Sequence, residues 1–76
     1  MKMLARLRYL IEEGFDVSSI SGYDDNSAEG NARLMYVEHR TDGTRRLRSE
    51  LFRVSYEEME QVSTLFLAYH SGGGKA

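Results

Sequence analysis

The sequence predicts an α+β domain in the order αβββα, with two helices packed on one face of a three-stranded antiparallel sheet. Apolar residues recur at helical spacing over residues 2–13 and again after Ser55. Between them, strand-forming runs flank an Asp42-Gly43 pair that favours a hairpin turn. The simplest way to bury both apolar stripes is to pack the two helices on the same face of the sheet.

The first helix is expected over residues 2–13, where an apolar stripe is made by Met3, Leu4, Leu7, Leu10 and Ile11. Gly14 suits the left-handed conformation that ends many helices. Residues 15–23 form a predicted strand, whose Ser and Gly content is typical of an edge or bulged strand. The polar segment 24–31, DDNSAEGN, is expected to be a loop.

The hairpin is expected to have strands over residues 32–40 and 44–52. A type I turn with a bulge through Thr41-Asp42-Gly43 pairs odd positions with odd positions. One face, predicted to be core, then carries Met35, Val37, Leu47 and Leu51. The other face, predicted to be exposed, carries Tyr36, Glu38, Arg46, Arg48 and Glu50. A tight two-residue turn would mix the two sets, so we prefer the first register.

The second helix is predicted to begin after Ser55, because Ser55 and Glu58 form a capping box and Val54 and Met59 a hydrophobic staple. Its buried stripe would consist of Met59, Val62, Phe66 and Tyr69. The predicted core combines Leu7, Ile11, Val37, Leu47, Leu51, Val62 and Phe66. The single α+β domain is expected to span residues 1–71, and a flexible Gly-rich tail residues 72–76.

Composition narrows the function classes. The 76 residues contain no Cys, which excludes disulfides, zinc-thiolate sites and thiol nucleophiles. The net charge of −2 argues against a general nucleic-acid coat. Residues 15–31 nevertheless carry four acidic residues and no cation, whereas residues 32–53 carry six arginines. We expect a cytoplasmic protein without a membrane segment, because no apolar run approaches the length of a membrane span.

No arrangement of residues predicts catalysis, a metal site or a cofactor. The two histidines, His39 and His70, lack a Cys or a second His at metal-ligand spacing. The acidic segment does not match a calcium-binding loop, because Ala28 stands where a ligand is needed. The glycine run before Lys75 lacks the residues of a phosphate-binding loop. We therefore expect a binding protein and not an enzyme.

Two charged surfaces are the candidate partner-binding sites. The basic one comprises Tyr36, Arg40, Arg45, Arg46 and Arg48, and the acidic one comprises Asp24, Asp25 and Glu29. The planar fork of arginine suits carboxylates and phosphates. The alternative is a solvated sheet face, with cross-strand pairs from Glu38 to Arg46 or Arg48. The acidic loop would then serve solubility, or it would mimic nucleic-acid phosphates.

A set of turn-forming residues matches a known family: Ser21, Gly22, Asp24, Asn26, Ser27, Asp42 and Gly43. Through them, residues 3–70 resemble phage-encoded type II-A anti-CRISPR proteins, acidic inhibitors of Cas9 that share this order of elements. The resemblance implies a protein that inhibits a host ribonucleoprotein complex. In that case Asp24, Asp25 and Glu29 correspond to part of the acidic region of the inhibitors. This chain lacks their third helix.

Residues 33–68 also resemble the arm-binding domains of tyrosine recombinases, through the runs RTDGTRRLR and SYEEME and through Phe52. In that family a sheet enters the major groove, which implies that Arg46 and Arg48 face DNA. Our first expectation is an anti-CRISPR-like phage or mobile-element protein that binds a host protein complex. The alternatives are DNA binding through the hairpin and a homodimer that buries Leu65 and Leu67.

Overall fold

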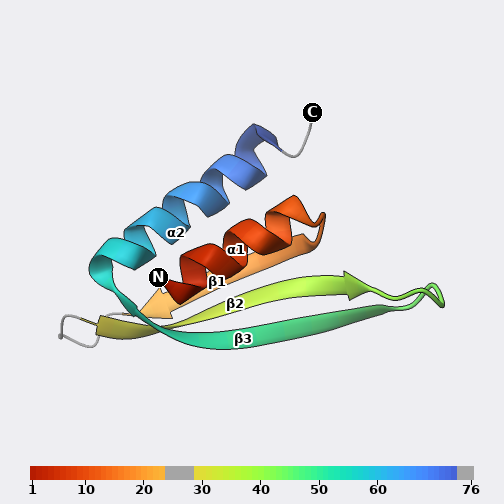
Figure 1. Ribbon diagram of the computed structural model, residues 1–76, viewed down its shortest axis with the longest axis horizontal. Helices are drawn as coiled ribbons and strands as arrows, with labels where there is room; N and C mark the ends of the chain where they lie inside the picture. The colour runs from red at the N-terminus through yellow and green to blue at the C-terminus, as the bar shows by residue number, and fades with distance from the viewer. Residues whose placement is uncertain (24–28, 74–76) are drawn as a thin grey trace.

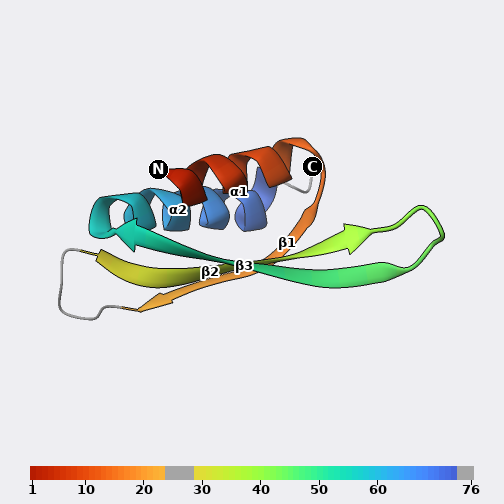
Figure 2. The same ribbon diagram turned by 60° about the horizontal axis from the view of Figure 1, so that its bottom comes forward.

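The computed structural model describes residues 1–23 and 29–73 and confirms the αβββα fold. Its elements are α1 (Lys2–Glu12), β1 (Asp16–Tyr23), β2 (Glu29–His39), β3 (Arg45–Ser55), α2 (Tyr56–Ala68) and a π-helical turn, η1 (Tyr69–Gly73). The strands form one antiparallel sheet in the order β1-β2-β3. Both helices lie on the same face of this sheet (Figures 1 and 2).

The helices form where the apolar periodicity places them. The buried residues of α1 are Met3, Leu4, Leu7 and Leu10. Gly14 follows α1 with a φ of 85°, a conformation that glycine adopts without strain. At the other end of the chain, helical backbone continues through η1 to Gly73, into the segment expected to be a flexible tail.

Half of the predicted capping box is present at the start of α2, because the Glu58 side chain caps α1 instead of the Ser55 amide. Ser55 Oγ accepts a hydrogen bond from the Glu58 amide at 3.1 Å, as in a capping box. The carboxylate of Glu58, which is 6% exposed, reaches the first turn of α1. Its Oε2 accepts hydrogen bonds from the amides of Met3 and Leu4 at 2.9 and 3.2 Å. The start of α1 is therefore capped by a side chain of α2.

The hairpin has the predicted turn and register. The Gly43 amide donates to the Arg40 carbonyl at 3.1 Å, and the Arg40 amide donates to the Thr44 carbonyl at 2.9 Å. This pattern, with a φ of 90° at Gly43, is that of a type I turn with a bulge. Odd positions pair with odd positions, for example Val37 with Leu47. Both strands extend three residues beyond the predicted end of the hairpin, from residue 32 back to 29 and from 52 on to 55.

The helices cover the hairpin face that we predicted to be exposed, so the predicted assignment of faces is wrong. The hairpin residues in the core are Ala32, Leu34, Tyr36 and Val54. Leu47 and Leu51, predicted to be core, are 59% and 69% exposed, and Val37 is half-buried on the same uncovered face. The error arises because both faces of the hairpin carry alternating apolar residues. The other predicted core residues lie as expected: Leu7 and Val62 are buried, and Ile11 and Phe66 pack against the core.

The outer edge of β1 is partly covered by side chains of η1, which follows α2. The Val17 amide donates to Tyr69 Oη at 3.2 Å, and this hydroxyl donates to the Phe15 carbonyl at 3.2 Å. His70 Nε2 lies 3.0 Å from the Val17 carbonyl oxygen. A register shift between Val17 and Ser19 confirms the predicted bulge. These contacts occupy backbone groups that another strand would otherwise pair with.

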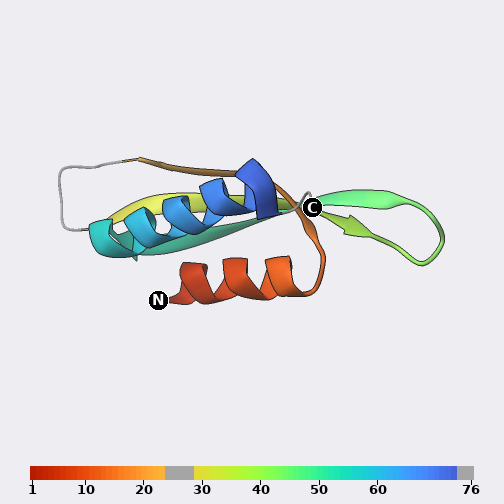
Figure 3. The same cartoon turned by 90° about the horizontal axis from the view of Figure 1, so that it is seen from above.

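The β2–β3 hairpin projects beyond the helices (Figures 1 and 3). The molecule measures 43 × 24 × 16 Å, and its radius of gyration is 13.0 Å. A compact chain of this length would have a radius of about 11 Å. Residues 39–49 are all exposed. The fold therefore consists of a helix-covered body and a two-stranded extension.

Candidate functional site: the hairpin arm and the open face

The projecting part of the hairpin, residues 38–48, is termed the hairpin arm. Arg48 Nη1 pairs with Glu38 Oε1 across the strands at 3.1 Å. Arg40, Arg45 and Arg46 form no ion pair with any residue in the described part of the chain. Their guanidinium groups are therefore available to a carboxylate or phosphate of another molecule.

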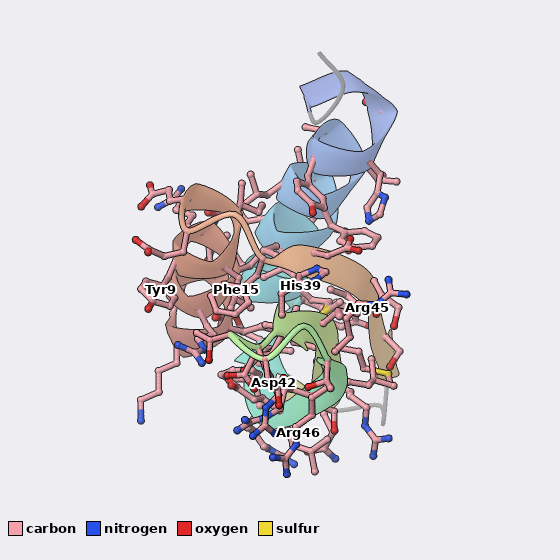
Figure 4. The ribbon with its side chains drawn as sticks, turned by 90° about the vertical axis from the view of Figure 1, so that its right-hand side faces the viewer. Tyr9, Phe15, His39, Asp42, Arg45 and Arg46 are labelled. Carbon is pink, nitrogen blue, oxygen red and sulfur yellow. The ribbon has the colours of Figure 1, made fainter. Side chains whose placement is uncertain are left out.

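Local hydrogen bonds hold the turn of the arm. Asp42 Oδ1 accepts from the hydroxyl and the amide of Thr44 at 2.6 and 3.0 Å. These two bonds, the hydroxyl first, hold the pKa of the Asp42 carboxyl below its usual value. Neighbouring side chains of a strand point to opposite faces, so Arg45 and Arg46 project in different directions (Figure 4). The arm therefore presents arginine on both of its sides.

A polar network joins the base of the arm to α1. Arg6 binds Glu50 through two hydrogen bonds, from Nε to Oε1 at 3.1 Å and from Nη2 to Oε2 at 2.9 Å. The Tyr36 hydroxyl donates to Glu50 Oε2 at 2.7 Å and accepts from Arg6 Nη2 at 3.3 Å. The ring of Phe15 meets Tyr36 edge-on, with centroids 5.6 Å apart. Because these residues come from α1, the following loop, β2 and β3, the network orients the arm relative to the body.

The charges in this network stabilise one another. Burial by itself would raise the pKa of Glu50, but the hydrogen bonds from Arg6 and Tyr36 and the charges of Arg6 and Arg48 outweigh it. The pKa of Glu50 is therefore below its usual value. The hydrogen bond to Glu50 is the main cause that raises the pKa of Arg6. Both groups stay charged at neutral pH, so the network fits a structural role.

The side of the sheet away from the helices is termed the open face. The apolar side chains that the register places on it are those of Met35, Val37, Leu47 and Leu51. Sequence reasoning assigned these four residues to the core and so missed this surface. The alternating apolar residues on the opposite face of the hairpin were the signal that could have revealed it, namely Ala32, Leu34, Tyr36, Phe52 and Val54.

Some of the residues predicted to bind a partner lie close together in the structure. The residues that lie together on the arm are Arg40, Arg45, Arg46 and Arg48. Tyr36 is only 4% exposed, so its predicted exposure is wrong. Its ring packs in the core, and its hydroxyl has partners in Arg6 and Glu50. Asp24 and Asp25 lie outside the described residues, and Glu29 is the first residue of β2.

Among residues 1–23 and 29–73, no group of three His, Cys, Asp or Glu side chains is placed to hold a metal ion. His39 lies on the arm opposite Arg45, whereas His70 lies beside Phe66 and Tyr69 at the end of α2. An open groove between α1 and α2 is lined by Leu4, Arg8, Glu60, Gln61, Thr64, Leu65 and Ala68. The arm and the open face remain the surfaces with the clearest binding chemistry.

Comparisons of this chain with protein-family models, with curated proteins and with solved structures find no match. None of the helices in the described ranges is both long and apolar enough to cross a membrane. Inference about function therefore starts from the chemistry of the arm and the open face.

Proposed function

We propose that this chain is a non-enzymatic protein that docks on an acidic surface of a host macromolecular complex through the hairpin arm and blocks that complex. The observation that carries the proposal is that Arg40, Arg45 and Arg46 lie on the hairpin arm, which projects beyond the helices (Figure 3), and form no ion pair among the described residues. The turn bonds and the Arg6–Glu50–Tyr36 network hold the hairpin, so docking through the arm would cost little further backbone entropy.

The charges and apolar groups around the arm favour a protein partner over a nucleic acid. The chain has a net charge of −2, and the first turns of α2 carry the exposed acidic residues Glu57 and Glu60. A duplex, which carries charge along its whole length, would be repelled by such a body. The open face adds exposed apolar groups beside the arginines, a combination that is common in protein interfaces.

The most specific form of the proposal is a phage or mobile-element inhibitor that acts in the cytoplasm on a CRISPR effector. Its support is the set of matching residues in the sequence, of which Asp42-Gly43 form the hairpin turn and Gly22 lies in β1. Because the arm is basic, this chain would contact the effector through a basic surface, whereas the anti-CRISPR proteins that it resembles use an acidic one.

The proposal is tested in cells that carry a type II-A CRISPR effector targeting a plasmid. Co-expression of this chain should protect the plasmid, and the Arg45→Glu/Arg46→Glu variant should lose that protection. A matched variant, Lys2→Glu/Arg8→Glu, reverses two cations at exposed positions of α1 and should still protect. A thermal melt of each purified variant verifies that it is folded. A folded wild-type chain that gives no protection would refute the CRISPR form of the proposal.

DNA binding is the second candidate function, and the shape of the arm favours it. A two-stranded β-ribbon fits the major groove of B-DNA, and this ribbon carries arginine on both sides. A gel-shift series at increasing salt separates the two functions. A DNA binder would lose affinity steeply with salt. Each removed phosphate contact would lower the slope of log affinity against log salt concentration by about 1. A protein-directed inhibitor would show no salt-sensitive affinity for DNA.

A further inference from the structure

The open face carries an apolar strip that is two strands wide. Its members are Met35 and Val37 on β2 and Leu47 and Leu51 on β3. Leu47 and Leu51 are 59% and 69% exposed, although each is a large apolar side chain. The remaining strand, β1, contributes polar residues to the same face beside the strip, namely Asp16, Ser19 and Ser21. Among the side chains that the structure describes on this face, the exposed apolar ones therefore lie on two neighbouring strands.

Cations stand at both ends of the strip. Arg45 follows the turn, two positions before Leu47 on the same strand and therefore on the same face. Arg33 lies directly opposite Leu51 at the other end. Neither arginine forms an ion pair with a residue in the described part of the chain. Among the described side chains of this face, Asp16 is the only carboxylate.

We infer that the open face binds an acidic amphipathic α-helix of a partner protein. The width of the strip fits one helix, because two strands about 5 Å apart present a surface comparable to a helix about 10 Å across. A second sheet would also have to cover Asp16 and the serines of β1. The distance from Leu47 to Leu51 along the strand is about 14 Å, which corresponds to about nine helical residues. Carboxylates flanking that stretch would meet Arg33 and Arg45.

A second copy of the chain complements this face poorly. Two open faces stacked about a two-fold axis are the same patch on both subunits. Such stacking would bring two sets of cations together, with one described carboxylate on each side to offset them. An acidic helix satisfies both the apolar strip and its charged ends. This surface shares Arg45 with the arm but not Arg40 or Arg46, and the inference rests on the apolar strip and not on inhibition of a host complex.

The probe is a synthetic peptide of about 18 residues, long enough to sample a helix in water. It carries Leu at positions i, i+4 and i+7 and Glu on both flanks of that stripe. One control peptide replaces every Glu by Lys, and another replaces every Leu by Ser. Binding to the full ¹⁵N-labelled chain is followed by NMR titration. The acidic peptide should shift the signals of Met35, Val37, Leu47 and Leu51 and bind roughly tenfold more tightly than either control.

Variants of the protein identify which residues contact the peptide. Leu47→Ser/Leu51→Ser should weaken binding of the acidic peptide roughly tenfold or more, because the peptide would no longer bury these two leucines. Leu67→Ser is the matched control: Leu67 is 65% exposed on α2, and its replacement should leave the affinity unchanged. Arg33→Glu should reduce the preference for the acidic over the basic peptide, because Arg45 alone is left to meet the acidic flanks. Arg46→Glu, which tests the arm, should not alter peptide binding, so failure of either proposal can be recognised separately.

Several outcomes would overturn the inference. The first is equal affinity for the acidic and basic peptides, and the second is a set of signal shifts confined to the groove between α1 and α2. The third is a loss of affinity in Leu67→Ser as large as that in Leu47→Ser/Leu51→Ser. Sedimentation that shows a dimer lost in Leu47→Ser/Leu51→Ser would identify a second copy as the occupant. Salt-sensitive binding of duplex DNA that shifts the same signals would identify a nucleic acid. If the double variant does not fold, shift mapping of the wild type and the reduced charge preference of Arg33→Glu still decide the question.

Discussion

Two glutamates, Glu50 and Glu58, connect segments that lie far apart in the sequence. Glu50 on β3 binds Arg6 on α1, and Glu58 on α2 accepts hydrogen bonds from the first amides of α1. Each carboxylate exchanges its water for protein donors, so its replacement leaves those donors without their charged partner. The position of α1 therefore depends on two acidic side chains outside it.

Glu50→Gln should lower the free energy of unfolding by about 1 kcal/mol at neutral pH, because a partly exposed ion pair adds little to its hydrogen bonds. The pKa of Glu50 in the folded chain lies below its ordinary value of 4.5. The stabilisation is therefore complete above that value and is lost as the pH falls through the lower, folded pKa. Urea unfolding of both proteins at a series of pH values should give stabilities that converge in acid. A constant difference across the series would contradict this assignment.

Glu58→Ala should cost about 2 kcal/mol of unfolding free energy, because two amides at the start of α1 lose a buried, charged acceptor. Glu57→Ala is the control, since Glu57 lies in the same turn of α2 but is exposed. Its effect should stay within about 0.5 kcal/mol. Urea unfolding measures both. Equal losses would show that the charge of the turn matters and that the contact with α1 does not.

Individual elements carry their own boundary signals in this chain. Gly14 and Gly43 have φ values of 85° and 90°, and they stand at the end of α1 and in the hairpin turn. Ser55 begins α2 through its hydrogen bond to the Glu58 amide. Each signal acts over a few neighbouring residues, so it operates wherever the element sits in the fold. The element boundaries therefore follow local chemistry closely.

Ser55→Ala should cost about 1 kcal/mol, because the Glu58 amide loses its side-chain acceptor. Ser49→Ala is the comparison, since Ser49 is exposed on β3, and its effect should stay within about 0.5 kcal/mol. Thermal melts of the two variants give the difference. A Ser55→Ala melt that coincides with the wild type would show that the cap contributes nothing to stability.

The whole molecule consists of two layers, with helices on one side of the sheet and solvent on the other (Figure 2). The hairpin is longer than the helices that cover it, so its turn end extends into solvent as the arm. Leu34 is fully buried beneath the helices, whereas Leu51 is 69% exposed on the open face. Two leucines of one hairpin thus have opposite environments. Replacing each of them by alanine therefore tests which face of the hairpin the helices cover.

Leu34→Ala should lower the free energy of unfolding by about 2–5 kcal/mol, because it removes a fully buried side chain. Leu51→Ala, on the open face, should change it by no more than about 0.5 kcal/mol. Urea unfolding of the two variants compares the faces directly. If Leu51→Ala proved the more damaging of the two, the helices would have to cover the opposite face.

The candidate site could be predicted only in part. The arginine-rich turn is visible in the sequence because Asp42-Gly43 marks a hairpin and the arginines flank it. The burial of Tyr36 was not predictable, since the partner of its hydroxyl at the helix side, Arg6, lies 30 residues away in the chain. The open face was missed for the same kind of reason, because its exposure depends on where the helices pack.

The sequence by itself determined the two helices, the Ser55 cap of α2, the bulged edge strand, the turn and the odd-to-odd register. All of these depend on periodicity or on residues a few positions apart. Only the tertiary structure decided which face of the hairpin is covered. Apolar residues alternate on both faces, so the local pattern leaves the two choices nearly equal. The choice was settled by the helices, by Glu58 capping α1, and by the Arg6–Glu50–Tyr36 network that allows a tyrosine to be buried.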